Sequence, residues 1–145
     1  RLDAIKLLTK AGIPTSIFMA PMIPALNDAE IERLLAKGAD AGATGAGYVL
    51  LRMPLEIKDL FAEWLEANYP DRAGRVLSLM RQMRGGKDYD AQWGKRMSGT
   101  GPYAALISRR FRLAAERLGL KKVSHPLDTG QFKPPPAVGD QLGLF

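Results

Sequence analysis

Few residues in this chain are able to do chemistry, and arginine is prominent among them. The 145 residues include no cysteine and one histidine, His125, which lies between Ser124 and Pro126. The missing thiols exclude disulfides, thiolate nucleophiles and cysteine metal sites, and one imidazole leaves little scope for zinc or a Ser-His-Asp arrangement. We therefore expect no metal site, assign no catalytic residue and interpret His125 as an exposed loop residue.

Positive charge is concentrated in one part of the chain, whose net charge is +6. Residues 1–70 hold 7 Lys/Arg against 9 Asp/Glu, residues 71–120 hold 11 against 4, and residues 121–145 hold 3 against 2. Such an asymmetry indicates either a polyanionic partner or an ordinary solvated helix face. Because aromatic residues interleave with the charges, we predict contacts to nucleic acid by backbone charge and base stacking. The predicted contact residues are Arg84, Lys87, Trp93, Lys95 and Arg96.

A nucleotide site of the P-loop type is excluded at the glycine pair of this basic part. Arg84-Gly85-Gly86-Lys87 lacks the GxxxxGK[ST] spacing with which backbone N–H groups surround phosphates.

Two short apolar runs, residues 16–20 and 48–51, have the length and composition of strands buried on both faces. We expect the first run to stop at Pro21, because proline does not belong inside a central strand. A helix between the runs is predicted to begin at Asn27 as N-cap, with Glu30 returning to the cap, and to end near Gly38 or Gly42. Strand, helix and strand in this order predict one parallel βαβ unit.

Helical spacing of apolar residues predicts four further helices, and glycine and proline predict the segments between them. The helices are expected at 2–10, 57–65, 72–83 and 102–118, with a long ordered loop at 87–100. From residue 121 the chain is rich in proline and glycine, which favours an extended tail. Because the pattern is already helical at residue 2, with no initiator methionine, we expect the protein to continue upstream of Arg1.

Several segments, in this order and spacing, resemble bacterial radical S-adenosylmethionine (SAM) proteins related to spore photoproduct lyase, the DNA-repair photolyase-like group. The resemblance covers about residues 1–120 and rests on order more than on any one motif. The segments are 1–4 (RLDA), 11–14 (AGIP), 20–28 (APMIPALND), 47–55 (GYVLLRMPL), 84–87 (RGGK) and 101–103 (GPY).

The resemblance implies an α/β fold, the C-terminal part of a partial (β/α)6 radical-SAM barrel, which is a TIM-like fragment with one parallel βαβ unit. The runs at 16–20 and 48–51 would be its fifth and sixth strands. We expect barrel strands and helices at 1–55, a basic helical extension at 56–120 and a tail at 121–145. The CxxxCxxC loop that holds a 4Fe-4S cluster would lie upstream, so this cysteine-free chain alone is expected to be inactive.

The resemblance also implies where SAM would touch this chain, because chemistry in barrels gathers at the C-terminal ends of strands. The predicted contacts to its adenosine part are Ala20, Pro21, Met22, Arg52 and Met53. The prolines here can equally serve to shape a turn. Burying a guanidinium without a partner is costly, so we expect Arg52 either to face a ligand phosphate or carboxylate or to form a structural ion pair.

The end of the chain, QLGLF, resembles the QLxLF peptide by which bacterial repair and replication proteins bind the DNA sliding clamp. A tail after a proline-rich segment presents large apolar side chains that fit a preformed groove. The alternative is that these side chains fold back onto the protein's own surface. The predicted partner-binding residues are Gln141, Leu142, Leu144 and Phe145.

Two functions remain open on the sequence alone. The first is the C-terminal portion of a radical SAM enzyme of the lyase type, which contacts SAM and its substrate and acts on nucleic acid in DNA repair. The alternative is a non-catalytic module that binds DNA or the sliding clamp. No run approaches the roughly 18 apolar residues of a membrane span, so we expect a cytoplasmic protein without membrane contact.

Overall fold

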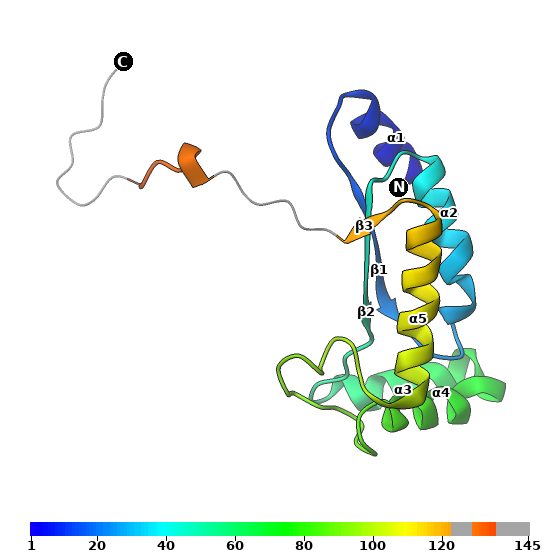
Figure 1. The fold of residues 1–145 in the computed structure, drawn as a ribbon. Coiled ribbons are helices and arrows are strands. Elements are labelled where there is room, and N and C mark those ends of the chain that lie inside the picture. Colours follow the sequence, from blue (N-terminus) through cyan, green and yellow to red (C-terminus); the bar gives the residue numbers. More distant parts are fainter. Residues whose placement is uncertain (123–128, 136–145) are drawn as a thin grey trace.

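The computed structural model describes residues 1–122 and 129–135, and it is a mixed α/β fold (Figure 1). A three-stranded sheet is accompanied by five α-helices in these residues. The elements are α1 (Leu2–Lys10), β1 (Ser16–Met22), the 3-10 helix η1 (Asp28–Glu30), α2 (Ile31–Asp40), β2 (Gly45–Leu50), α3 (Ile57–Asn68), α4 (Pro70–Gln82), α5 (Gly101–Arg117), β3 (Lys121–Lys122) and the 3-10 helix η2 (Thr129–Gln131).

The predicted parallel βαβ unit is confirmed. β1 pairs with β2 in parallel, with Ser16 opposite Gly45 and Met19 opposite Tyr48, and α2 lies between the two strands in sequence. The sheet order is β1-β2-β3, and β3 adds a third parallel strand beside Gly45 and Ala46. The expected tail thus begins with a short strand, which two lysines give no apolar pattern to predict.

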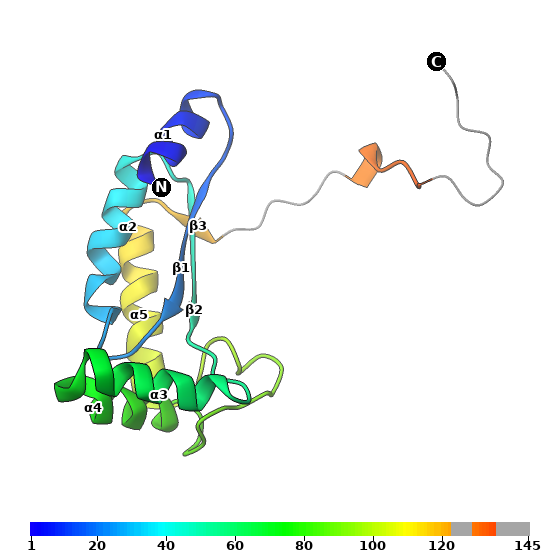
Figure 2. The same cartoon turned by 180° about the vertical axis from the view of Figure 1, so that it is seen from behind.

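One face of the sheet is covered by α2 and α5, which run beside the strands (Figure 2). Gly38 of α2 lies against Ile17 of β1, since a Cβ at this position would be 2.8 Å from the Ile17 Cδ1 atom. Phe111 of α5 packs on Tyr48 of β2 with ring centroids 4.7 Å apart. These contacts place the main core between the sheet and the two helices.

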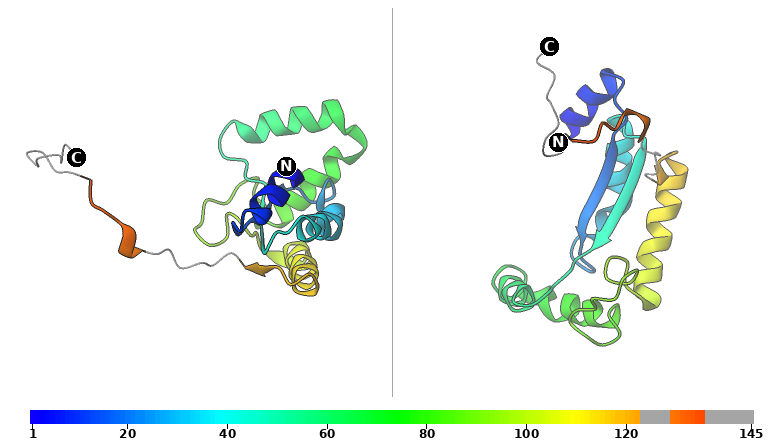
Figure 3. Two further views of the ribbon diagram at one scale, coloured as in Figure 1. Left: turned by 90° about the horizontal axis from the view of Figure 1, so that it is seen from above. Right: turned by 90° about the vertical axis from the view of Figure 1, so that its left-hand side faces the viewer.

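The helices α3 and α4 cross the molecule at the C-terminal ends of β1 and β2 (Figure 3). Leu65 of α3 and Ala73, Val76 and Met80 of α4 are fully buried. All four helices predicted outside the βαβ unit are present with boundaries within a few residues, and residues 87–100 form the expected loop.

The start of α2 differs from the prediction. The Asn27 side chain accepts the Ile23 N–H through its Oδ1 atom at 2.7 Å and donates to the Pro21 carbonyl at 3.0 Å. It therefore makes no side-chain bond to the helix, and the predicted capping box is wrong. Glu30 pairs with Arg33 instead of returning to the cap. Asn27 thus organises the turn that follows β1.

Of the two ends predicted for this helix, Gly38 and Gly42, the structure agrees with the second, because α2 passes Gly38 and ends at Asp40, just before Gly42. Gly38 has no side chain and lets the helix approach Ile17 closely. The predicted end of β1 is wrong. β1 continues through Pro21 to Met22. Proline is tolerated there because β1 is an edge strand in the described sheet, so a missing N–H breaks no ladder. Within residues 1–122 and 129–135, no helix is both long and apolar enough to cross a membrane.

Candidate functional site

The parallel register brings the predicted site residues of the two strands to one end of the sheet. Met22 lies opposite Leu50, and the Leu51 N–H donates to the Met22 carbonyl at 2.9 Å. Ala20 and Pro21 at the end of β1 therefore lie beside the segment in which Arg52 follows β2. The sequence correctly predicted that these two segments meet.

Two of the five predicted adenosine contacts are core residues. The side chains of Met22 and Met53 are 1% and 2% exposed, and both belong to the main hydrophobic cluster. Their buried side chains offer little surface to a ligand, and the predicted contacts of these two residues with adenosine stay a prediction. Ala20 and Pro21 are exposed. An unbranched thioether after a proline fits a gap in the core as readily as it fits a ligand surface.

Arg52 is half-buried, and its side chain hydrogen-bonds to a tyrosine. One terminal nitrogen donates to the Tyr89 hydroxyl at 3.1 Å, across 37 residues of sequence. In the described part of the chain Arg52 forms no ion pair, and its Nε atom is buried without a hydrogen-bond partner. The structural ion pair considered for this residue is therefore not found among the described residues.

Arg84 is the most buried charged side chain among the described residues, at 3% exposure. One terminal nitrogen donates to the carbonyls of Lys95 and Arg96 at 3.1 and 2.7 Å. The other donates to the Leu51 carbonyl at 2.9 Å. Burial lowers the pKa of this guanidinium, and nearby Asp90 opposes that effect. Arg84 thus holds the loop against the end of β2, and its predicted role as a nucleic-acid contact is corrected.

The other predicted nucleic-acid residues are on the surface of the loop that Arg84 holds. Trp93 is 82% exposed, and the Arg96 guanidinium lies 4.3 Å from its ring centroid. Lys87 and Lys95 are exposed in the same loop. A guanidinium stacked on an exposed indole presents a flat, positively charged surface. The structure thus leaves four of the five predicted residues accessible.

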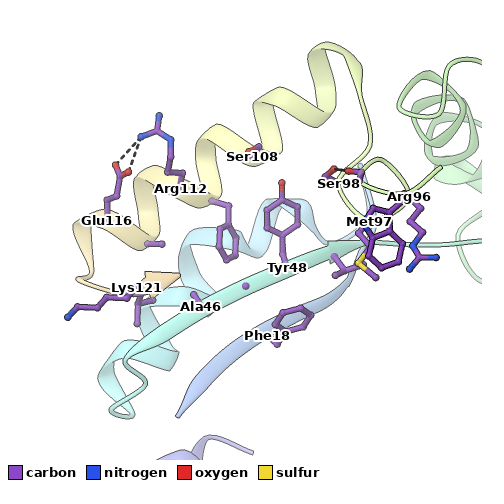
Figure 4. A pocket seen from close by; sticks show the side chains of 17 residues that line it. Phe18, Ala46, Tyr48, Arg96, Met97, Ser98, Ser108, Arg112, Glu116 and Lys121 are labelled. Atoms are coloured by element: carbon purple, nitrogen blue, oxygen red, sulfur yellow. Dashed lines mark hydrogen bonds and ion pairs between the residues drawn. The ribbon is translucent and has the colours of Figure 1, made fainter. Parts of the chain in front are cut away.

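A groove of about 940 Å³ lies beside β2, and we call it the β2 groove. It runs between the edge of β2, the helix α5 and the loop segment 93–98 (Figure 4). Tyr48 of β2 and Phe111 of α5, whose rings pack together, line it on the α5 side. Phe18 lies on the other side of the strand. Sequence reasoning missed this groove. The available signal was Gly45 and Gly47 just before the predicted strand at 48–51, since glycine in a strand often marks a close approach by another group.

In the part of the chain that the structure describes, the strand edge inside the β2 groove is only partly paired. On this edge the Thr44 carbonyl accepts from the Lys121 N–H at 3.0 Å, and the Leu50 N–H donates to the Met97 carbonyl at 2.9 Å. Successive residues of a strand point their backbone groups to alternate edges, so those of Tyr48 point to this edge too. Among the described residues β3 pairs only with Gly45 and Ala46, which leaves the Tyr48 N–H and C=O open.

The donor chemistry of this chain does not fit an iron–sulfur cluster. Thiolates hold such clusters, and the sequence has no cysteine. Among the described residues no group of three or more His, Asp or Glu side chains is placed to hold a metal ion.

The fold and these sites define a mixed α/β chain with an open sheet end and a basic, aromatic loop. The chain is 31% identical over 84 residues to uncharacterized proteins of Mycobacterium tuberculosis and Mycobacterium bovis. The aligned part covers 57% of this chain and 25% of each relative, so the chain matches about a quarter of their length. No family model and no solved structure matches the chain.

Proposed function

We propose that this chain is the C-terminal portion of a radical SAM enzyme related to spore photoproduct lyase. In this role it supplies part of the surface on which the adenosine of SAM and the substrate rest. The observation that carries the proposal is the parallel register that brings Ala20–Pro21 and Arg52 to the same end of the sheet. That end is where barrel enzymes collect their site residues.

The exposed face of β1 near this end offers apolar contacts for part of a nucleoside. Phe18 is 60% exposed on the side of β1 away from α2, and Ala20 is exposed two residues further on the same face. Their apolar atoms would exclude water from one side of a base or ribose. The Arg52 guanidinium, which has no ion-pair partner among the described residues, would attract an anionic group, a carboxylate or a phosphate. The radical chemistry that SAM supplies depends on a cluster for which this chain has no ligand, so we assign it to a segment beyond this chain.

The test uses the complete gene product that contains this chain, reconstituted with iron and sulfide without oxygen. We expect a 4Fe-4S absorbance band and SAM binding in equilibrium dialysis. Ala20→Trp, at an exposed position, should weaken SAM binding at least about tenfold, because a bulky ring occupies the nucleoside surface. Ala105→Trp, exposed on α5, is the matched control and should leave SAM binding unchanged. A complete protein that takes up no cluster, or an Ala20→Trp variant with unchanged affinity, would contradict the proposal.

A second candidate function is nucleic-acid binding without catalysis, and the Trp93–Arg96 stack favours it. An exposed indole under a guanidinium suits stacking of a single-stranded base, with Lys87 and Lys95 nearby for phosphates. The tail that resembles a clamp-binding peptide, residues 141–145, lies outside the described residues, so that part of the alternative stays a prediction.

Fluorescence anisotropy with labelled single-stranded DNA at low salt tests this candidate. Trp93→Ala should weaken binding about tenfold, in line with about 1–3 kcal/mol per stacked base. Trp64→Ala is the matched control, since Trp64 lies on α3 and stacks on Phe61. A parallel titration with purified sliding clamp tests the tail. Absence of DNA binding at low salt, together with clamp binding that is unaffected by deletion of residues 141–145, rejects the non-catalytic module.

A further inference from the structure

We propose that the outer face of α3 binds a basic, amphipathic helix of another protein. The face is a row of three side chains, Ile57, Leu60 and Trp64, which we call the α3 ridge. The inference goes beyond the radical SAM proposal and does not rest on it, because no residue of the α3 ridge is among those proposed to contact SAM or nucleic acid.

The first argument is that three large apolar side chains are exposed on one face of a helix. Ile57 is 42%, Leu60 57% and Trp64 43% exposed, and spacings of three and four residues place them in one row. Leu65 is the one buried residue of α3 in the described part of the chain, so α3 joins the core through another side of the helix. The helix lies at the periphery of the molecule (Figure 3). A contiguous apolar surface of this kind marks an interaction site.

The second argument is that the largest side chain of the α3 ridge is already held in place. The Trp64 ring stacks on Phe61 with centroids 5.8 Å apart and an angle of 18° between the planes. It also contacts the Tyr69 ring, at 5.4 Å between centroids. A ring that its neighbours orient loses little conformational freedom when a partner binds. Tryptophans of this kind carry much of the binding energy in protein interfaces, so we assign Trp64 as the anchor.

The third argument is the charge beside the α3 ridge, which selects the class of partner. Residues 55–69 include four Asp/Glu and one Lys, although the whole chain has a net charge of +6. Glu56 and Glu63 lie four residues before and three residues after Leu60, so both border the ridge, and both are exposed. Carboxylates repel nucleic acid and anionic lipid, and they attract lysine and arginine. The partner therefore carries positive charge.

The shape of the α3 ridge favours a helix as the partner. From Ile57 to Trp64 the ridge extends about 10 Å, at roughly 1.5 Å per residue. A row of side chains on one helix packs into the groove between two rows on another helix. An added strand would need an open backbone edge, which a helix lacks because its N–H and C=O groups are bonded within it. A partner helix with one apolar face and lysine or arginine beside that face meets both requirements.

Fluorescence anisotropy with the full chain tests the proposal. The probe is a fluorescein-labelled amphipathic helix of about 14 residues, with leucine on one face and lysine elsewhere. The matched control peptide has glutamate in place of lysine and should not bind. Trp64→Ala should weaken binding of the lysine peptide at least about tenfold. Trp93→Ala removes the exposed indole of the loop and should leave the affinity unchanged. Glu56→Gln with Glu63→Gln should weaken binding about fivefold and reduce its dependence on salt.

A second variant separates loss of binding from loss of fold. Leu60→Asp changes a side chain that is 57% exposed, so it should keep the circular dichroism of the wild type and still abolish peptide binding. Absence of binding to the wild type would overturn the proposal, as would equal binding of the two peptides or an unchanged affinity in Trp64→Ala. Sedimentation equilibrium of the chain alone gives a further check. Self-association that Trp64→Ala abolishes would also overturn the proposal, because the α3 ridge would then bind a second copy.

Discussion

The two faces of the sheet differ in what covers them, although the same two strands build both. On one face Met19 is 8% exposed and Ile17 and Tyr48 pack under α2 and α5. On the other face Phe18 is 60% exposed and Ala20 is exposed as well. Because side chains alternate along a strand, successive residues of β1 point toward the core and toward the exposed surface. Stability should therefore depend on the first face, and binding on the second.

The largest expected difference in the free energy of unfolding is between the variants Leu35→Ala and Phe18→Ala. Leu35 of α2 is fully buried on the covered side, and its truncation should cost about 3 kcal/mol in the free energy of unfolding. Phe18→Ala should cost about 1 kcal/mol or less, because most of its surface is already in water. Urea unfolding followed by circular dichroism measures both. Equal losses would show that the open face is covered in solution, and the comparison of faces would then fail.

A smaller loss is expected where Arg84 joins the loop to the end of β2. Arg84→Ala removes the donor of three carbonyls, so we expect a loss of about 2 kcal/mol in unfolding free energy. It should also raise the mobility of Trp93, seen as lower fluorescence anisotropy in a Trp64→Phe background. Lys87→Ala, exposed in the same loop, is the control and should change neither quantity. An unaltered anisotropy in Arg84→Ala would mean that other contacts position the loop.

The smallest expected effect is a pH dependence of the unfolding free energy, which comes from an ion pair on the covered face of the sheet. Arg110 of α5 donates to both carboxylate oxygens of Glu32 of α2 at 2.9 and 2.7 Å, and this hydrogen bonding lowers the pKa of Glu32. A carboxyl group whose pKa is lower when folded stabilises the fold above its unfolded pKa, and this contribution is lost as the pH falls through the folded pKa. Glu32 is 51% exposed, so we expect only about 0.5 kcal/mol.

The measurement compares wild type with Glu32→Gln in urea at pH 7 and at pH 3. The wild type should be the more stable at pH 7, and the difference should shrink at pH 3. Glu63→Gln, exposed on α3, is the matched control. A difference that grows as the pH falls would contradict the assignment of this ion pair to the folded state.

Much of the fold follows from local pattern. The helix boundaries and the parallel pairing were predictable because apolar spacing and the order of strand, helix and strand are local properties of the sequence. The capping of α2 was not predictable, because the Asn27 side chain can bind either the helix or the turn before it. In the structure it accepts the Ile23 N–H of that turn. The run of β1 through Pro21 depends on β1 lying at a sheet edge, which a pattern does not reveal.

The candidate site was less predictable than the fold. That Ala20–Pro21 and Arg52 lie at one end follows from parallel strands, and this was predicted. Arg84 was not separable from the surface arginines, because its three acceptors are backbone carbonyls that lie 11, 12 and 33 residues away in sequence. The burial of Met53 and the β2 groove depend in the same way on which segments approach from elsewhere in the chain.

The hydrogen bond from the Leu50 N–H to the Met97 carbonyl has a consequence for self-association. An exposed strand edge is a template on which further copies of a chain can add and grow into aggregates. Among residues 1–122 and 129–135, the loop covers the far end of the β2 edge and β3 covers the near end, which leaves a short stretch without a partner. This stretch of the β2 edge is too short to nucleate an extended intermolecular sheet, so among the described residues the edge strand β1 is where another copy could add.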